Sequence, residues 1–142
     1  MIVVPYKAEH LLDLQIQEGQ RGVAPFITEA YAKALEDGYT FSALEDGRPL
    51  VVGGIAKVWD NRGLVWAFMG QNAGPHFVAI HKAAMGLLAK APYRRLEADT
   101  PCGFEQGHRW LRMLGFKLEA ERMEAYGVDG SDSALYARVN HG

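Results

Sequence analysis

The chain has 142 residues, of which 49% are hydrophobic and 23% are charged, and its formal net charge is −2. This length and composition predict one folded domain over residues 1–142 and exclude a disordered chain. The charge balance does not indicate a nucleic-acid surface, no apolar run reaches the roughly 18 residues of a membrane span, and the N-terminus lacks the pattern of a signal peptide. Because the single cysteine, Cys102, cannot form an internal disulfide, we expect a cytoplasmic protein.

The first half of the chain combines short apolar runs with helical patterns. It predicts, in order, a strand over residues 2–6, helices over 8–18 and 25–37, and strands over 39–44, 50–59 and 64–69. Two glycines after the first helix and Gly38 after the second are typical of helix ends. The pair Gly53-Gly54 interrupts the long strand, which indicates a bulge or a close backbone contact. Tight turns join the three strands into an antiparallel meander.

The second half of the chain alternates helices and strands. It predicts a helix over 76–90, a strand over 95–99, a helix that ends at Gly115, and strands over 116–126 and 133–139. Because a helix connects the strands at 64–69 and 95–99, we expect these two strands to pair in parallel. The whole order, β-α-α-β-β-β-α-β-α-β-β, predicts an α/β domain with a mixed sheet and helices on both faces.

The stretch from Trp66 to Lys90 has the pattern of a strand, a tight loop and a helix. An apolar run ends at Met69, the sequence Gly70-Gln71-Asn72-Ala73-Gly74-Pro75 follows, and a helical pattern begins at His76. Backbone N–H groups at a helix N-terminus favour an anion such as a pyrophosphate. Gly70 and Gly74 suit a left-handed backbone or the close approach of a ligand. The alternative is a plain connection between a strand and a helix.

This order of elements resembles the GNAT fold, the fold of the Gcn5-related N-acetyltransferases. The family's acetyl-CoA loop has the pattern Gln/Arg-x-x-Gly-x-Gly/Ala between its fourth strand and third helix, and Gln71-Asn72-Ala73-Gly74-Pro75-His76 stands at that place. A helix that ends in Leu114-Gly115-Phe116 and a C-terminal hairpin also match the family. The resemblance implies that the cofactor is acetyl-CoA and that the residues holding it are Met69, Gly70, Gln71, Asn72, Ala73, Gly74 and His76.

Two positions depart from the family pattern. Many members carry a tyrosine four residues before the glycine that ends the helix, where it protonates the leaving thiolate of CoA, and this chain has Leu111 there. The last small residue of the loop is replaced by His76, whose ring is bulky beside a pyrophosphate but adds a hydrogen-bond donor. Both departures weigh against catalysis, while Gln71 and Gly74 keep the pattern of a loop that binds CoA.

Two side chains are candidates for the proton transfers of an acetyltransferase. Asp99 ends a strand, where ligands bind in open α/β sheets, and it is the candidate general base. His108 shares a helix face with Leu111 and is the candidate general acid in place of the missing tyrosine. The alternatives are that Asp99 or Thr100 caps the following helix, and that His108 is a partly buried residue bonded to a backbone carbonyl.

Aromatic and metal-binding patterns add two expectations. Trp66 and Phe68 point to the same face of one strand, where they form either part of the core or a surface for a partner. His76 and His81 fall on different sides of a helix. No His or Cys cluster has the spacing of metal ligands, so no metal is expected.

The overall pattern of the chain is also similar to GNAT-like proteins of short-tailed bacteriophages, among them the internal core protein of the virion. The similar features are Met-Leu-Gly-Phe, then Tyr-Gly-Val-Asp-Gly and a final Leu-Tyr-Ala-Arg. This resemblance implies a degenerate acetyl-CoA site and a structural or binding role, in the host-cell cytoplasm or in the virion, through a protein partner or self-association. The alternative function is an acetyl-CoA-dependent N-acetyltransferase that transfers an acyl group to an amine.

Overall fold

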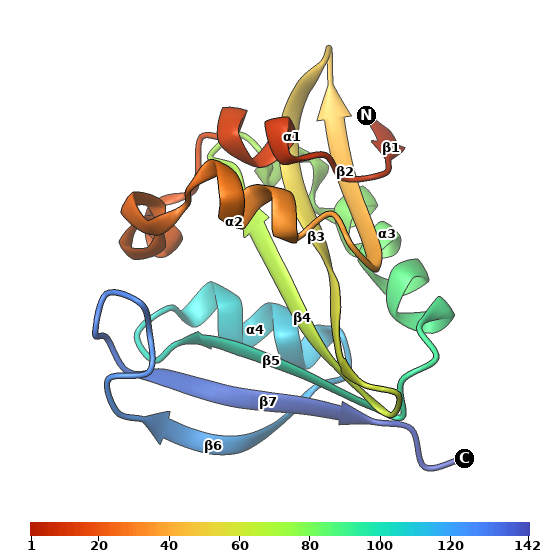
Figure 1. Cartoon of the computed structure of the whole chain (residues 1–142), viewed down its shortest axis with the longest axis vertical. Coiled ribbons are helices and arrows are strands. Elements are labelled where there is room, and N and C mark those ends of the chain that lie inside the picture. The colour runs from red at the N-terminus through yellow and green to blue at the C-terminus, as the bar shows by residue number, and fades with distance from the viewer. The chain divides into compact units, whose positions relative to one another are not determined.

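The computed structural model describes the whole chain, residues 1–142, and its elements follow the predicted order (Figure 1). The strands are β1 (Ile2–Val4), β2 (Tyr39–Glu45), β3 (Arg48–Trp59), β4 (Arg62–Met69), β5 (Arg95–Pro101), β6 (Lys117–Met123) and β7 (Ser133–Val139). The helices are α1 (Ala8–Asp13), α2 (Glu29–Ala34), α3 (Phe77–Lys90) and α4 (Glu105–Met113), with two 3₁₀ segments, η1 (Glu18–Phe26) and η2 (Gly74–His76). The strands form one sheet in the order β1-β2-β3-β4-β5-β7-β6, which confirms the predicted mixed α/β sheet.

The chain divides into two compact units, and β3 and β4 run through both. Unit 1 consists of Met1–Ala56 and Trp66–Ala91, and unit 2 consists of Lys57–Val65 and Pro92–Gly142. The single domain expected over residues 1–142 stays a prediction. No helix of the chain is both long and apolar enough to cross a membrane.

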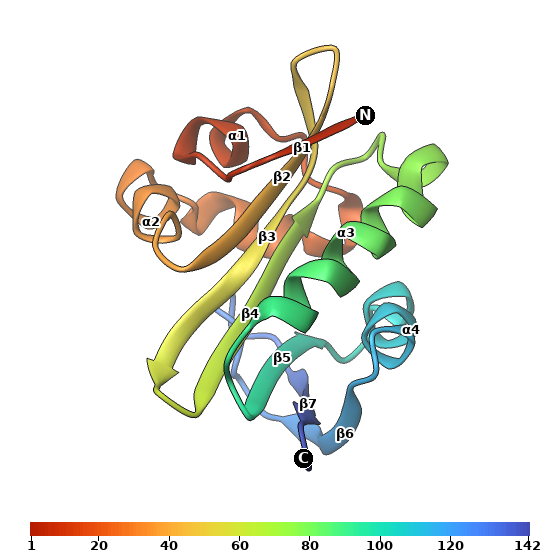
Figure 2. The ribbon, with the colours of Figure 1, turned by 90° about the vertical axis from the view of Figure 1, so that its right-hand side faces the viewer.

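In unit 1 the strands lie between α1 and α2 on one face and α3 on the other (Figure 2). The core next to α1 and α2 consists of buried side chains, namely Tyr6, Leu11, Leu14, Ala32, Val52 and Phe68, with Trp66 packed against them. The centroid of the Trp66 ring lies 5.1 Å from that of Tyr6 and 6.1 Å from that of Phe68. The strand face that carries Trp66 and Phe68 is therefore core and not a surface for a partner.

The glycine pair in β3 is a close contact and not a bulge. β2 and β3 pair in regular register at Gly53 and Gly54, and the register shifts elsewhere, between Ala43 and Leu44. A Cβ atom on Gly54 would lie only 3.0 Å from the Trp66 ring. The absence of side chains in β3 thus gives the Trp66 ring the space in which it packs.

The two N-terminal helices are shorter than their periodicity predicts. α1 ends at Asp13 rather than at residue 18, because residues 15–20 bond to the end of β4 instead of continuing the helix. α2 begins at Glu29 rather than at residue 25, since the Thr28 side chain caps it by accepting the Tyr31 N–H at 3.1 Å. η1 occupies the interval in which two glycines had indicated a helix end.

Several element boundaries differ by a few residues in the second half of the chain, and two of these differences have a local cause. α3 begins at Phe77 rather than at residue 76, after the short segment η2, which has Pro75 near its start. β6 ends at Met123 rather than at residue 126, because the chain turns at Ala125, whose φ is 55°. Both differences lie within the few residues by which the ends of elements usually vary.

In unit 2, β5 pairs in parallel with β4 and antiparallel with β7, which confirms the parallel pairing expected from the sequence. Arg62 donates two hydrogen bonds of 2.8 Å to Glu97, and Arg95 bonds to both Glu97 and Glu119. The hydrogen bonds from Arg62, first, and from Arg95 lower the pKa of the Glu97 carboxyl, although burial opposes them. Glu97 is therefore held as a carboxylate in a ladder of ion pairs across the strands.

Candidate functional site

The loop between β4 and α3, residues 71–76, leaves two backbone N–H groups without an acceptor in the protein. Gly70 and Gln71 donate their N–H groups to carbonyl oxygens of neighbouring segments, at 2.7 and 2.9 Å, and the buried Ala73 anchors the loop. The N–H groups of Asn72 and Gly74 form no such bond. Asn72 lies in the turn before η2 and Gly74 begins η2, the segment that leads into α3, and the start of a helix favours a negatively charged group.

Space is open in front of Gly74. A Cβ atom on this residue would meet no other atom within 4 Å, whereas a Cβ atom on Gly70 would lie 3.0 Å from both the Leu14 side chain and the Leu50 carbonyl oxygen. Neither glycine has a positive φ, so of the two alternatives given for them the left-handed backbone is wrong. Gly70 is needed because protein atoms approach it closely, and Gly74 is where a ligand has room to approach the loop.

The His76 ring lies beside a neighbouring carboxylate. Its Nε2 is 3.5 Å from Glu45 Oε2. The N-terminal amine, through a hydrogen bond and its charge, and then His76 lower the pKa of the Glu45 carboxyl. The ring therefore occupies space next to Glu45, and Gly74 stays open despite the bulky residue at the last position of the loop.

The segment Gln15–Gln20, which we call the glutamine strap, covers the free backbone edge at the end of β4. Gln17 donates its N–H to the Met69 carbonyl at 2.8 Å. The Gln20 side chain accepts the Met69 N–H at 2.9 Å and donates to the Ala67 carbonyl at 2.8 Å. Because the Gln20 side chain takes its N–H, Met69 has no free backbone donor to offer a ligand in this conformation.

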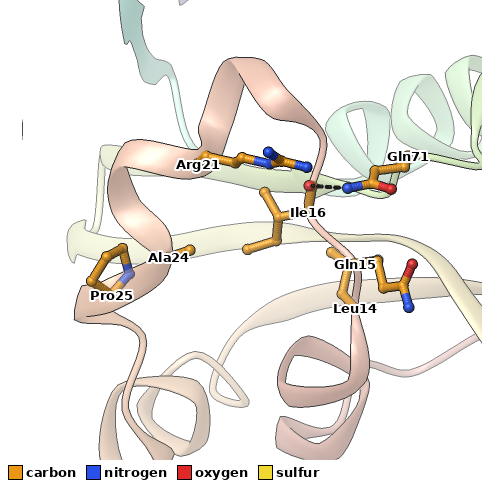
Figure 3. A pocket seen from close by; sticks show the side chains of 7 residues that line it. All are labelled: Leu14, Gln15, Ile16, Arg21, Ala24, Pro25 and Gln71. Carbon is orange, nitrogen blue, oxygen red and sulfur yellow. Dashed lines mark hydrogen bonds between the residues drawn. The ribbon is translucent and has the colours of Figure 1, made fainter.

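A pocket of about 400 Å³ opens beside the glutamine strap in unit 1 (Figure 3). Its walls include the apolar side chains of Leu14, Ile16, Ala24 and Pro25 and the polar side chains of Arg21 and Gln71. Gln71 donates its side-chain amide to the Ile16 carbonyl at 3.4 Å, so a residue of the 71–76 loop also forms part of the pocket. Arg21 extends along the pocket toward Gln71, as Figure 3 shows, and no carboxylate of the protein pairs with it.

Asp99 lies near the end of β5, between the buried residues Ala98 and Thr100, and its side chain is accessible to solvent. The N-cap of α4 is Phe104, so the alternative in which Asp99 or Thr100 caps this helix is wrong. Desolvation by the surrounding protein raises the pKa of the Asp99 carboxyl, while a hydrogen bond to its own backbone opposes the rise. A raised pKa brings a carboxylate closer to the range in which a general base works.

Both ring nitrogens of His108 form hydrogen bonds within unit 2. Nε2 lies 3.0 Å from the Cys102 carbonyl and 3.2 Å from the Pro101 carbonyl, and because both are acceptors we infer that Nε2 carries the proton. With the proton on Nε2, Nδ1 accepts a hydrogen bond of 2.7 Å from the Tyr136 hydroxyl, and the hydroxyl oxygen accepts a 3.3 Å bond from Arg112. His108 thus has the carbonyl-bonded arrangement that was its alternative interpretation, and its role as a general acid stays a prediction.

Two polar residues of the candidate site, one that interacts with Asp99 and one in the pocket, could hardly be recognised as functional from the sequence. Burial, first, and then the carboxylate of Asp99 raise the pKa of the Tyr126 hydroxyl, whose only sequence signal is the turn Tyr-Gly-Val-Asp-Gly. Arg21 lies in a polar stretch with two glycines, a pattern typical of a helix end and not of a pocket.

Leu111, at the position of the family's tyrosine, is 8% exposed. No group of three or more His, Cys, Asp or Glu side chains is arranged to bind a metal.

No family model matches the chain, and no curated protein matches its sequence. Its structure is similar to that of Ard1 from Thermoplasma volcanium, with 14% identity, a TM-score of 0.80, and 99% of this chain and 98% of that chain covered. An acetyltransferase of the GNAT family from Streptococcus pneumoniae has 14% identity, a TM-score of 0.66 and coverage of 98% and 99%. An N-acetyltransferase from Staphylococcus aureus Mu50 has 9% identity, a TM-score of 0.72 and coverage of 97% and 96%.

The fold is thus that of the GNAT acetyltransferases, as the order of elements in the sequence predicts. These similarities in sequence are low, and a shared fold does not by itself confer a shared reaction. The chemistry of this chain has to be argued from the residues of its own site.

Proposed function

We propose that the protein is an acyl-CoA-dependent N-acyltransferase that binds acetyl-CoA at the 71–76 loop. The observation that carries the proposal is the pair of N–H groups without acceptors, on Asn72 and Gly74, just before α3. Such groups at the start of a helix bind phosphates in many proteins, and the open space at Gly74 lets a phosphate approach. Of the other expected residues, Gly70 and Ala73 shape the loop, and the Gln71 side chain forms part of the pocket beside it.

The proposed reaction needs no covalent intermediate with the enzyme. The amine nitrogen of the acceptor bonds to the acyl carbon, the carbon–sulfur bond breaks, and the sulfur leaves as the thiolate of CoA. The amine proton goes to a base or to water, and the role of Asp99 as that base stays a prediction. Leu111 has no proton to give the thiolate, but a thiol with a pKa of about 8.5 leaves readily and takes its proton from water.

Isothermal titration calorimetry tests the proposal. We expect acetyl-CoA to bind with a dissociation constant in the micromolar range. Gly74→Glu should weaken binding at least tenfold, about 1.4 kcal/mol, because a carboxylate then faces the phosphates. Gly86→Glu is the matched control, since it adds the same charge to α3 at a position where a Cβ atom also meets nothing within 4 Å, and it should bind as the wild type does.

Two results would contradict the proposal. One is the absence of heat with acetyl-CoA up to millimolar concentration. The other is equal binding of acetyl-CoA and acetyl-pantetheine, which lacks the diphosphate, because the loop would then play no part. A positive result leads to a screen for the amine acceptor, with the release of free thiol as the readout.

A structural or binding role without catalysis, in the host-cell cytoplasm or in a virion, is the second candidate function. Two observations favour it: Leu111 is an apolar residue where a proton donor would act, and the glutamine strap occupies the backbone groups of Met69. This role predicts no binding of acetyl-CoA, together with self-association or a protein partner. Sedimentation velocity over a range of protein concentrations measures the self-association directly.

A further inference from the structure

The pocket beside the glutamine strap combines an apolar wall with one unpaired positive charge. Leu14, Ile16, Ala24 and Pro25 form the apolar part, and the Arg21 side chain extends along the pocket past Ile16 toward Gln71 (Figure 3). A guanidinium prefers a carboxylate, which it can bind through two parallel hydrogen bonds. An apolar wall gains free energy when it covers an aliphatic group. The chemistry that fits this pocket is therefore a carboxylate with a short aliphatic side chain.

The pocket is shallow and open, and its volume indicates what size of ligand its walls can contact. A volume of about 400 Å³ lies near the lower end of the range for small-molecule sites. A ligand the size of one amino acid fits such a volume. A longer peptide would place its C-terminal carboxylate far from its N-terminal amine, so the two groups would not both lie near one small pocket.

The place of the pocket in unit 1 connects it with the 71–76 loop. In unit 1, α1 and α2 lie on one side of the strands and α3 on the other (Figure 2), and the pocket is lined mainly by residues between α1 and α2. Gln71 belongs to both features, because it starts the loop that leads into α3 and its side chain bonds to Ile16 at the pocket. Gln71 therefore links the pocket to the loop that leads into α3.

We propose that this pocket binds the acyl acceptor, and that the acceptor is a small amine that also carries a carboxylate and an aliphatic side chain. Arg21 would bind the carboxylate, and Leu14 and Ile16 would contact the aliphatic group. The role as acceptor rests on the proposed acyl transfer. The preference for a carboxylate does not, because it follows from Arg21 and the apolar wall alone.

Two probes that differ by one charge test this site. N-acetyl-L-leucine has the carboxylate and the aliphatic side chain, and N-acetyl-L-leucinamide has the same shape without the negative charge. We expect titrations followed by two-dimensional NMR, without acetyl-CoA, to show the acid binding about tenfold more tightly than the amide. The amide signals that shift should include those of Ile16 and Arg21. N-acetylglycine should bind more weakly than N-acetyl-L-leucine, because it lacks the aliphatic side chain.

Arg21→Gln should remove the preference for the acid over the amide and leave binding of the amide unchanged. Lys82→Gln is the matched control, because it removes the same charge from an exposed position on α3 and should keep the preference. Equal affinities for the two probes, or a preference that survives Arg21→Gln, would overturn the proposal. Failure of acetyl-CoA to bind in calorimetry would instead overturn the proposed function, and a carboxylate site that persists would then not be an acceptor site.

Discussion

Gly54 stands at a place in unit 1 where no side chain fits. A Cβ atom there would lie 2.7 Å from the Tyr39 carbonyl oxygen and 3.0 Å from the Trp66 ring. Neither group can retreat easily, because the first is backbone within a strand and the second packs against the core. We expect Gly54→Ala to lower the free energy of unfolding by about 1 to 3 kcal/mol, which is typical of overpacking. Urea denaturation followed by far-UV circular dichroism measures the change.

Gly86 is the matched control for the same substitution. It is exposed on α3, and a Cβ atom there would meet no atom within 4 Å. Gly86→Ala should therefore raise the free energy of unfolding by about 0.5 to 1 kcal/mol, through the better helix propensity of alanine. If Gly54→Ala were as stable as the wild type or more stable, the close packing of β3 against Trp66 would be disproved.

At the scale of elements, the glutamine strap is held by the bonds of one side chain as much as by its backbone. Gln20 bonds to both Met69 and Ala67, so Gln20→Ala leaves an N–H and a carbonyl without partners. We expect a loss of about 1 to 2 kcal/mol in the free energy of unfolding. Hydrogen exchange should become faster at the Gln17 and Gln71 amides, because these two bonds join the strap to β4 and the 71–76 loop.

Gln15→Ala is the control for the strap. The exposed Gln15 side chain forms no hydrogen bond in the protein, and its backbone carbonyl, which accepts the Gln71 N–H, is kept in the variant. Its stability and its exchange rates should therefore match those of the wild type. Unchanged exchange at Gln17 in Gln20→Ala would mean that the backbone bonds alone hold the strap.

For the whole molecule, the order of elements could be predicted because each element has a local pattern of apolar residues in the sequence. Leu87 and Leu88 recur at helical spacing with Ile80 and Ala84, and the structure has α3 there. The strap carries no such pattern, since its side-chain bonds join residues 47 and 49 positions apart. For this reason the helix expected over 8–18 was too long.

The candidate site likewise has one part with a local sequence pattern and one part without. The 71–76 loop could be found because glycine, proline and glutamine stand at fixed spacing between a strand and a helix. The pocket could not, because Arg21 and Gln71 are distant in sequence and meet only when the strap lies on β4. The electrostatic influence of Asp99 on Tyr126 likewise depends on the fold, because the two residues are far apart in the sequence.

The last prediction concerns the cooperativity of the two units. β3 and β4 each run through both units, so unfolding of one unit would remove strands from the other. Domains below about 150 residues usually unfold in one step, and we expect a single transition over residues 1–142. Two variants test this: Trp59→Phe/Trp110→Phe keeps Trp66 as the reporter in unit 1, and Trp59→Phe/Trp66→Phe keeps Trp110 in unit 2. Within each variant, tryptophan fluorescence and circular dichroism should give the same urea midpoint, and separate midpoints would show two independent domains.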